Sequence, residues 1–285
     1  MKDLSINAKE NKEITQETPK AKKINATGKI AIFDSGVGGI SFLHLAMQML
    51  PKEDFIFYGD LANAPYGEKP KDFVQERASQ IIDFLLEKGA KIIVIACNTA
   101  TSAAVAHLRQ KYAEPDILGM EPAIQLAVNS GEKKIILLST PITAHAENTI
   151  RLINANSAKA DILNFPCPGL MDLVENNQSL PPAENQQQIK AYINQKFNGV
   201  ILPDYDGSFV LGCTHYIFLR NILHSMYPKA RLYDGNLGTA RNLLHHLESE
   251  NLLNTANNKG SVEFYSSVGS SEFTAKAKIF LTKVF

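Results

Sequence analysis

The sequence has no tryptophan and only three cysteines, and it carries no excess charge of either sign. Its 29 Lys and Arg residues are balanced by 29 Asp and Glu residues, without a long block of one sign. Such a chain lacks the electrostatic footprint of a protein that binds nucleic acid or an anionic membrane. We therefore expect no nucleic acid and no membrane as a partner, and favour a small molecule.

Long apolar runs and a signal peptide are also missing. No uninterrupted apolar run approaches the roughly 20 residues that cross a bilayer, and the N-terminus has no apolar h-region. Three thiols in 285 residues do not make a disulfide framework. These absences favour a protein of the reducing cytoplasm.

The length of the chain is sufficient for two compact domains. Residues 1–28 are polar and poor in residues that build a core, which predicts a flexible N-terminal arm. Apolar runs and helical patterns alternate after the arm, as in α/β proteins. We expect a discontinuous first α/β domain of residues 29–122 plus 235–285, and a second α/β domain of residues 123–234.

Two similar stretches organise the chain. Residues 92–99 and 209–215 are each an apolar run that leads into a cysteine and then into polar side chains. Both runs are typical of buried parallel strands, and the loops beyond the carboxyl ends of such strands line ligand sites. A buried cysteine is often only a small hydrophobe. The polar residues that follow Cys97 and Cys213 favour a chemical role for both.

The first strand expected in each half also ends in polar residues. Residues 30–33 lead into Asp34 and Ser35, and residues 135–138 lead into Ser139 and Thr140. In each half, therefore, the first expected strand ends in polar residues, and a later expected strand is followed by a cysteine. We predict two similar parallel-sheet α/β domains related by pseudo-twofold symmetry, with the active site in the cleft between them.

The glycine-rich turn at residues 36–39 fits neither the dinucleotide nor the Walker phosphate-binding spacing. We expect it instead to let the backbone and the preceding carboxylate approach a compact polar ligand. Farther along, residues 176–188 are rich in Asn, Gln and Pro, which predicts a surface loop. Helices are expected over residues 189–197 and 217–227, and Cys167, which lies between two prolines, is interpreted as structural.

Several reactions of thiols fit two distant cysteines poorly. A disulfide oxidoreductase uses a close Cys-x-x-Cys pair, a structural zinc site needs four ligands, and a cysteine hydrolase needs only one thiol. Proton transfer at a stereocentre uses two groups, one on each face of the carbon. Asp34 is the natural helper of Cys97, while His215 and Glu175 are candidates to assist Cys213, although His215 is equally consistent with an ordinary loop histidine.

Four motifs in this order resemble the glutamate racemases of the cofactor-independent aspartate/glutamate racemase family: residues 33–39 (FDSGVGG), 63–67 (NAPYG), 96–100 (ACNTA) and 212–216 (GCTHY). The resemblance implies an isomerase that interconverts L-glutamate and D-glutamate and supplies D-glutamate for peptidoglycan, and hence for cell-wall biogenesis and cell shape. It implies that Cys97 is the base toward D-glutamate and Cys213 the base toward L-glutamate, with Asp34, Glu175 and His215 assisting.

The resemblance also implies no pyridoxal phosphate, no metal and no other cofactor. Because the polar arm is long, activation by the peptidoglycan precursor UDP-N-acetylmuramoyl-alanine is a hypothesis, and so is a homodimer. Substrate contacts are implied for four pairs of loop residues: Asp34 and Ser35, Tyr66 and Gly67, Asn98 and Thr99, Thr214 and His215.

Other functions stay open on the sequence. The nearest rival is a racemase of aspartate or another acidic amino acid, and a hydantoin-type racemase or a maleate isomerase is more distant. A two-lobed protein that binds an anionic metabolite without turning it over is the alternative from a different class. A binding protein of that kind would not need the two thiols, so loss of Cys97 or Cys213 distinguishes it from an enzyme.

Overall fold

The structure is a computed structural model that describes residues 25–176, 182–257, 259–269, 273–275, 277 and 280–281. Residues 1–24 of the expected N-terminal arm lie outside the described residues. The end of that arm lies against the first sheet, where the buried Lys91 donates to the carbonyl of Ala26.

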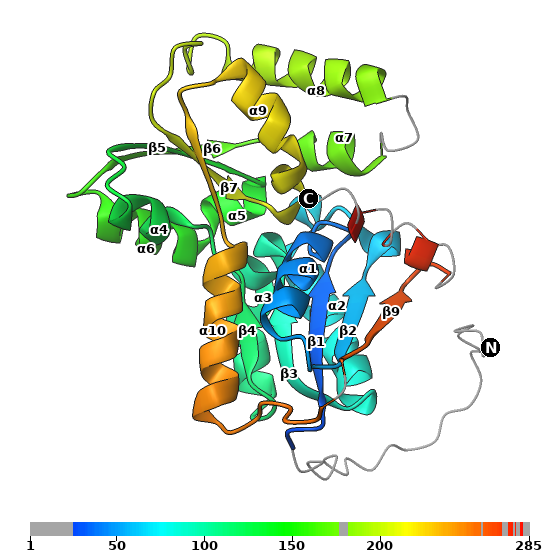
Figure 1. Ribbon diagram of the computed structural model, residues 1–285. Helices are drawn as coiled ribbons and strands as arrows, with labels where there is room; N and C mark the ends of the chain where they lie inside the picture. The colour runs from blue at the N-terminus through cyan, green and yellow to red at the C-terminus, as the bar shows by residue number, and fades with distance from the viewer. Residues whose placement is uncertain are drawn as a thin grey trace.

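The chain forms two separate parallel sheets, one in each half of the molecule (Figure 1). The first sheet has the strand order β4-β3-β1-β2-β9, and the second has the order β6-β5-β7-β8. Every strand pair in both sheets is parallel, so the predicted architecture of two parallel-sheet α/β domains is confirmed. The strands are β1 (Lys29–Asp34), β2 (Phe55–Gly59), β3 (Ala90–Ile95), β4 (Ile117–Gly119), β5 (Lys134–Ser139), β6 (Asp161–Pro166), β7 (Ser208–Gly212), β8 (Arg231–Asp234) and β9 (Val262–Ser266).

The two strand orders are the same when the halves are aligned on their first strands. Pairing β1 with β5 makes β2, β3 and β4 equivalent to β6, β7 and β8, and only β9 is left over at the edge of the first sheet. This repeat places Cys97, after β3, and Cys213, after β7, at equivalent strand ends.

Helices cover both faces of the first sheet because alternate strand residues point to opposite sides. Ile30 and Ile32 pack in one apolar cluster with α1 (Ile40–Met49) and α10 (Asn236–Ser249). Ala31 and Phe33 pack in the other cluster with α2 (Lys71–Glu87) and α3 (Asn98–Lys111).

The second sheet is covered in the same way. Ile135 and Leu137 pack on the side of α4 (Ile124–Asn129) and α6 (Glu147–Asn156), whereas Ile136 and Leu138 pack on the opposite side. The opposite side, in the upper part of Figure 1, carries the remaining helices of this half. They are α7 (Leu170–Asn176), α8 (Pro182–Phe197), the 3₁₀ helix η4 (Thr214–Leu219) and α9 (Arg220–Met226), and the short α5 (Pro141–His145) follows β5.

One local prediction is wrong, and another is confirmed except at its ends. The surface loop expected over residues 176–188 is helical from Pro182 onward, and residues 177–181 lie outside the described residues. Proline suits the first turn of a helix and glutamine is a good helix former, while the buried Ile189, Ile193 and Phe197 repeat every four residues. The helix expected over residues 217–227 begins as a 3₁₀ helix at Thr214 and ends at Met226.

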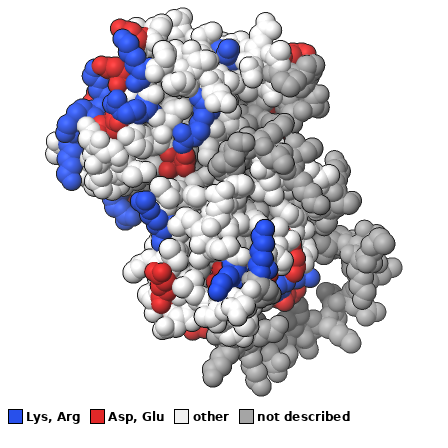
Figure 2. Space-filling view, viewed as in Figure 1, with Lys and Arg blue, Asp and Glu red and all other residues white. Residues whose placement is uncertain are grey.

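The surface of the described residues shows no field of a single sign in the view of Figure 2, where Lys and Arg lie next to Asp and Glu in both domains. In the described ranges, no helix combines the length and apolar character that crossing a bilayer requires.

Candidate active site

Cys97 lies where β3 ends and α3 begins, and its side chain caps that helix. Sγ accepts a hydrogen bond from the amide of Ala100 at 3.4 Å and lies 3.4 Å from Oγ of Ser35. The residue is only 4% exposed. Burial, followed by the nearby charge of Asp34, raises the pKa of the Cys97 thiol to about 12. These surroundings therefore favour the protonated form of the Cys97 thiol.

Asp34 is completely buried at the carboxyl end of β1. One carboxylate oxygen accepts the amide hydrogen of Gly36 at 2.8 Å, and the other accepts the hydroxyl hydrogen of Thr214, from the second domain, at 3.0 Å. Burial raises the pKa of Asp34, and the positive charge of His215 and these two hydrogen bonds reduce the effect without reversing it. The carboxyl group is thus easier to protonate than an exposed aspartate.

His215 links Cys213 to Glu175. Nδ1 of the imidazole lies 3.9 Å from Sγ of Cys213, and Nε2 is 2.5 Å from Oε2 of Glu175. Burial by itself would lower the pKa of His215, but the charge of Glu175 and the contact with Cys213 raise it well above the ordinary value. Of the two predicted helpers, His215 therefore lies beside Cys213 and Glu175 lies behind His215, and a positive charge lies next to this thiol.

The glycine-rich turn lets the two domains approach closely. A Cβ atom on Gly36 would lie 2.2 Å from Oε2 of Glu175, and one on Gly38 would lie 2.4 Å from Oγ1 of Thr214 and 2.8 Å from the amide nitrogen of His215. All three distances are shorter than ordinary Cβ contacts, so a side chain at either position would force its neighbours to shift. The turn thus makes room for side chains and backbone of the second domain.

A second hydrogen bond joins the domains on the other side of the site. Oγ1 of Thr99 lies 2.9 Å from Oγ1 of Thr140, whose hydroxyl donates to Thr143. Under the pseudo-twofold repeat this pair corresponds to Thr214 and Asp34, because each joins a cysteine-bearing loop to the first strand end of the other domain. Thr140 was visible in the sequence as part of a polar strand end, but its contact with Thr99 was not foreseen.

The other residues with expected substrate contacts also lie in this buried region. The Tyr66 hydroxyl donates to Asp60 at 2.5 Å, and Nδ2 of Asn98 donates to the carbonyl of Met120 at 3.2 Å. Gly67 packs against Thr140, since a Cβ atom at Gly67 would lie 3.0 Å from the Cβ of Thr140. The Tyr66 hydroxyl is therefore occupied within the protein, and the backbone of Tyr66 and Gly67 is the part left to meet a ligand.

Cys167 does not belong to this group. It is 1% exposed within the apolar cluster of the second domain, and its thiol donates to the carbonyl of Phe165 at 3.5 Å. Within the described part of the chain, no three His, Cys, Asp or Glu side chains are grouped so that they could hold a metal ion.

The arrangement sets two buried thiols in unlike electrostatic surroundings. Cys97 has a carboxylate near it, whereas Cys213 has a histidine that is held in its charged form. The two thiols also influence each other, because charge on Cys213 contributes to the raised pKa of Cys97. Such a pair is suited to remove a proton with one sulfur and return a proton with the other.

Relatives of known identity match almost the whole chain. A glutamate racemase of Clostridium botulinum (strain Okra / Type B1) is 42% identical over 244 residues, 84% of this chain and 91% of the relative. The chain belongs to the glutamate racemase family. Another member, from Clostridium botulinum (strain Alaska E43 / Type E3), is 38% identical over 251 residues, 87% of this chain and 95% of the relative. No family model matches the chain.

Solved structures of glutamate racemases share the two-domain fold. The enzyme of Thermus thermophilus, in complex with beta-chloro-D-alanine, superposes with a TM-score of 0.74 at 31% identity, covering 90% of this chain and 94% of its own. The isoform RacE1 of Bacillus anthracis gives a TM-score of 0.78 at 26% identity with the same coverage. The Escherichia coli enzyme, in complex with L-glutamate and the activator UDP-MurNAc-ala, gives 0.74 at 26% identity, covering 89% of this chain and 95% of its own.

Proposed function

We propose that this member of the glutamate racemase family interconverts L-glutamate and D-glutamate by proton transfer between the α-carbon and two thiols, without a cofactor. One observation carries the proposal. Cys97 and Cys213 lie at equivalent strand ends of the two domains, both buried, with a carboxylate beside the first and a charged histidine beside the second. A reaction that uses two faces of one carbon needs two such groups.

In the direction from L-glutamate to D-glutamate, Cys213 acts as the base. The His215 cation stabilises its thiolate, which takes the α-proton and forms an S–H bond as the C–H bond breaks. The electron pair left on the α-carbon spreads into the adjacent carboxylate. The Cys97 thiol then gives its proton to the opposite face, so that a new C–H bond forms and Cys97 becomes a thiolate. In the reverse direction the two sulfurs exchange roles.

Each thiol must then recover its starting protonation state. We assign this task to Asp34 on the side of Cys97, because its raised pKa lets it carry a proton. His215 serves Cys213 at 3.9 Å, and Glu175 keeps the imidazole charged and oriented. The contacts of His215 with Cys213 and Glu175 support the roles on one side, and the charge interaction between Asp34 and Cys97 supports the role on the other.

The substrate carries two carboxylates and one ammonium group. Hydroxyl groups, side-chain amides and backbone N–H groups donate hydrogen bonds to carboxylates, and hydroxyl and amide oxygens accept hydrogen bonds from an ammonium group. The amides of Tyr66 and Gly67 open the short helix η2 (Tyr66–Glu68) and have no partner inside it. The proposed contact residues are Asp34, Ser35, Tyr66, Gly67, Asn98, Thr99, Thr214 and His215.

The choice of glutamate rests on the relatives. The Francisella tularensis enzyme was solved in complex with D-glutamate and superposes with a TM-score of 0.74 at 25% identity. The Clostridium relatives are named for the same substrate. Aspartate, which is shorter by one methylene, is the next substrate to test.

In the cell we propose that the product D-glutamate enters peptidoglycan and that the enzyme works in the cytoplasm. The prediction is that expression of the chain restores growth of a bacterium that requires added D-glutamate. A Cys97→Ser variant, expressed at the same level, should not restore it. Growth with the variant equal to growth with the wild type would contradict the assignment.

We further propose that UDP-MurNAc-ala, an activator of the Escherichia coli relative, activates this enzyme through the N-terminal arm. The test compares the full chain with a chain that lacks residues 1–24. The deletion ends there because the carbonyl of Ala26 accepts a hydrogen bond from the buried Lys91. Equal activity and equal response to the compound in both chains would remove the arm from the proposal.

The homodimer is likewise a proposal, and exposed apolar side chains support it. Leu163, Val200 and Leu202 line a groove of about 430 Å³ beside β6, and all three are exposed. Such a surface is suited to burial by a second copy. Sedimentation equilibrium of the full chain tests it: a mass of about one chain at all concentrations would contradict a dimer.

The activity itself is tested by circular dichroism of L-glutamate solutions incubated with the purified full chain and no added cofactor. We expect wild-type protein to bring the signal to zero, as an equal mixture of enantiomers requires. Cys97→Ser and Cys213→Ser should abolish the change. Cys167→Ser, a matched replacement of a buried cysteine outside the site, should preserve it. Binding of glutamate without turnover would instead indicate a two-lobed binding protein.

A further inference from the structure

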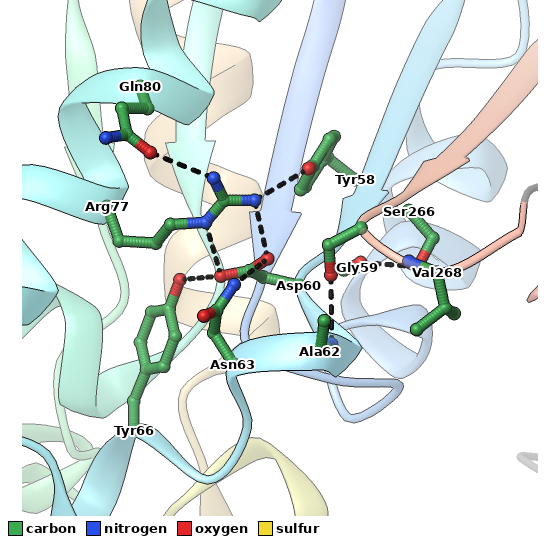
Figure 3. A network of polar contacts seen from close by, with 11 residues as sticks. Tyr58, Gly59, Asp60, Ala62, Asn63, Tyr66, Arg77, Gln80, Ser266 and Val268 are labelled. Carbon is green, nitrogen blue, oxygen red and sulfur yellow. Dashed lines mark hydrogen bonds and ion pairs between the residues drawn. The ribbon is translucent and has the colours of Figure 1, made fainter. Parts of the chain in front are cut away.

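A buried polar network lies at the carboxyl end of β2, beside the proposed site (Figure 3). Its centre is Asp60, which is completely buried. One carboxylate oxygen accepts the Tyr66 hydroxyl at 2.5 Å and Nε of Arg77 at 2.9 Å. The other accepts Nη2 of Arg77 at 2.8 Å and Nδ2 of Asn63 at 3.1 Å. Two donors on each oxygen leave this carboxylate no capacity to act on a substrate.

The charges in the network are fixed by these contacts. Burial alone would raise the pKa of Asp60, but hydrogen bonds from Arg77, Tyr66 and Asn63 outweigh burial and lower it. Burial and the charge of Asp60 raise the pKa of Tyr66 far above its usual range. Asp60 is therefore negatively charged throughout the physiological range of pH. The Tyr66 hydroxyl keeps its proton and donates a hydrogen bond over the same range. Neither exchanges protons with a substrate, so any contribution of the network to the reaction comes through position.

The network anchors the segment that joins β2 to α2, which contains η1 (Leu61–Asn63) and η2. The ring of Tyr66 packs in the first-domain cluster that also contains Cys97. On the other side of the segment, Ala64 packs against the apolar cluster of the second domain, and Gly67 packs against Thr140. The segment thus lies between the two domains and next to Cys97.

Further hydrogen bonds hold Arg77 and the segment that it anchors. Arg77, on α2, also donates to the hydroxyl of Tyr58 at 3.0 Å and to Oε1 of Gln80 at 3.0 Å. The chain after β9 contributes from the other side, where Oγ of Ser267 accepts the amide hydrogen of Ala62 at 2.9 Å. A planar guanidinium with paired hydrogen bonds to a carboxylate has a fixed orientation, which a single charge would not provide.

We propose that Asp60 and Arg77 are positioning residues of this enzyme: they hold Tyr66 so that the backbone of Tyr66 and Gly67 closes the site beside Cys97 and against Thr140. The inference rests on the proposed function, because it assigns these residues to the binding of the substrate of that reaction. It differs from a purely structural role in one respect. Loss of the network should weaken substrate binding at temperatures where the protein is fully folded.

The test measures kcat and KM for L-glutamate with three variants, Asp60→Asn, Tyr66→Phe and the double variant. We expect Asp60→Asn to raise KM and lower kcat/KM roughly ten- to hundredfold, because a displaced binding segment loses its alignment with the substrate. Tyr66→Phe should lower kcat/KM in the same way. The double variant should be no worse than Asp60→Asn alone, since Tyr66→Phe removes a hydrogen bond that Asp60→Asn has already weakened.

The matched control is Glu53→Gln. Glu53 forms a buried ion pair with Lys91 at 2.6 Å. This pair lies near the amino-terminal ends of β2 and β3, away from the site. This change also replaces a buried carboxylate by an amide. It should lower the melting temperature while leaving kcat and KM unchanged. If Asp60→Asn behaves like this control, or if its effect on kcat/KM adds to that of Tyr66→Phe, the positioning role is wrong.

Hydrogen exchange of the same variants, without substrate, separates this inference from the proposed function. We expect amides of residues 61–68 to exchange about tenfold faster in Asp60→Asn and Tyr66→Phe than in wild type or Glu53→Gln. Tyr66→Phe keeps the ion pair, so it carries the test if Asp60→Asn does not fold. If wild-type protein failed to racemise glutamate, the proposed function would fall, whereas unchanged exchange at residues 61–68 would overturn the anchoring itself.

Discussion

Thr214 donates its hydroxyl hydrogen to the buried carboxylate of Asp34 over 3.0 Å and thereby joins the two domains next to both thiols. The corresponding contact in the repeat is the 2.9 Å hydrogen bond between Thr99 and Thr140. The two contacts are not chemically alike, because one ends on a carboxylate and the other on a hydroxyl. The two halves of the site therefore share a geometry but differ in charge, which matches the unlike surroundings of the two thiols.

The first prediction concerns this hydrogen bond. Thr214→Val removes the hydroxyl while keeping the shape, so Asp34 stays buried with one donor fewer, at a cost of about 1–3 kcal/mol in the free energy of unfolding. We expect kcat/KM for glutamate to fall as well. Thr149→Val is the control, because the buried hydroxyl of Thr149 has no hydrogen-bond partner among the described residues. Urea unfolding should show no loss for that variant, and an equal loss for both would contradict the account.

A second prediction follows from the close approach at Gly38. A methyl group there would meet Oγ1 of Thr214 at 2.4 Å and the amide nitrogen of His215 at 2.8 Å. Because the backbone of His215 cannot move without shifting the second domain, Gly38→Ala should reduce kcat/KM strongly. Gly238→Ala, inside α10 with open space around it, should instead stabilise the protein by about 0.5–1 kcal/mol. Steady-state kinetics and thermal unfolding of both variants check this, and full activity of Gly38→Ala would refute it.

A third prediction concerns pH. The pKa of His215 is raised in the folded protein, so its contribution to stability is complete below the ordinary pKa of about 6.5 and is lost as pH rises through the folded pKa. Glu175→Gln removes the charge that sustains this shift. We expect the stability of that variant to stay constant at alkaline pH, where the stability of the wild type falls. We also expect the fall of kcat/KM on the alkaline side to begin at a lower pH in the variant. Glu53→Gln should leave the limb in place, and an unmoved limb in Glu175→Gln would assign the charge to another group.

The repeated pattern of apolar run, cysteine and polar residues was enough to predict the parallel sheets and the equivalence of Cys97 and Cys213. It succeeded because buried strands and the residues at their carboxyl ends are local features of the sequence. The position of Cys97 at the start of α3 is likewise local, because β3 ends and α3 begins within a few residues of it.

Contacts between distant segments were harder to foresee. His215 and Glu175 are 40 residues apart and meet because η4 and α7 lie side by side on the second sheet. Asp60 and Arg77 meet because β2 and α2 place them together, and a single Asp and Arg in sequence carry no signal of that pairing. The glycine turn was expected to let the backbone approach a ligand, whereas the atoms that lie against Gly36 and Gly38 in the structure belong to side chains and backbone of the other domain.

The most direct test of two-thiol proton transfer is the isotope content of glutamate at low conversion in D₂O. The full chain is given L-glutamate, the enantiomers are separated, and deuterium at the α-carbon is measured by mass spectrometry. We predict that D-glutamate carries deuterium from Cys97, while recovered L-glutamate, whose proton is held by Cys213, remains unlabelled. Equal labelling of both enantiomers from the start would contradict two separate bases and indicate a single group that serves both faces.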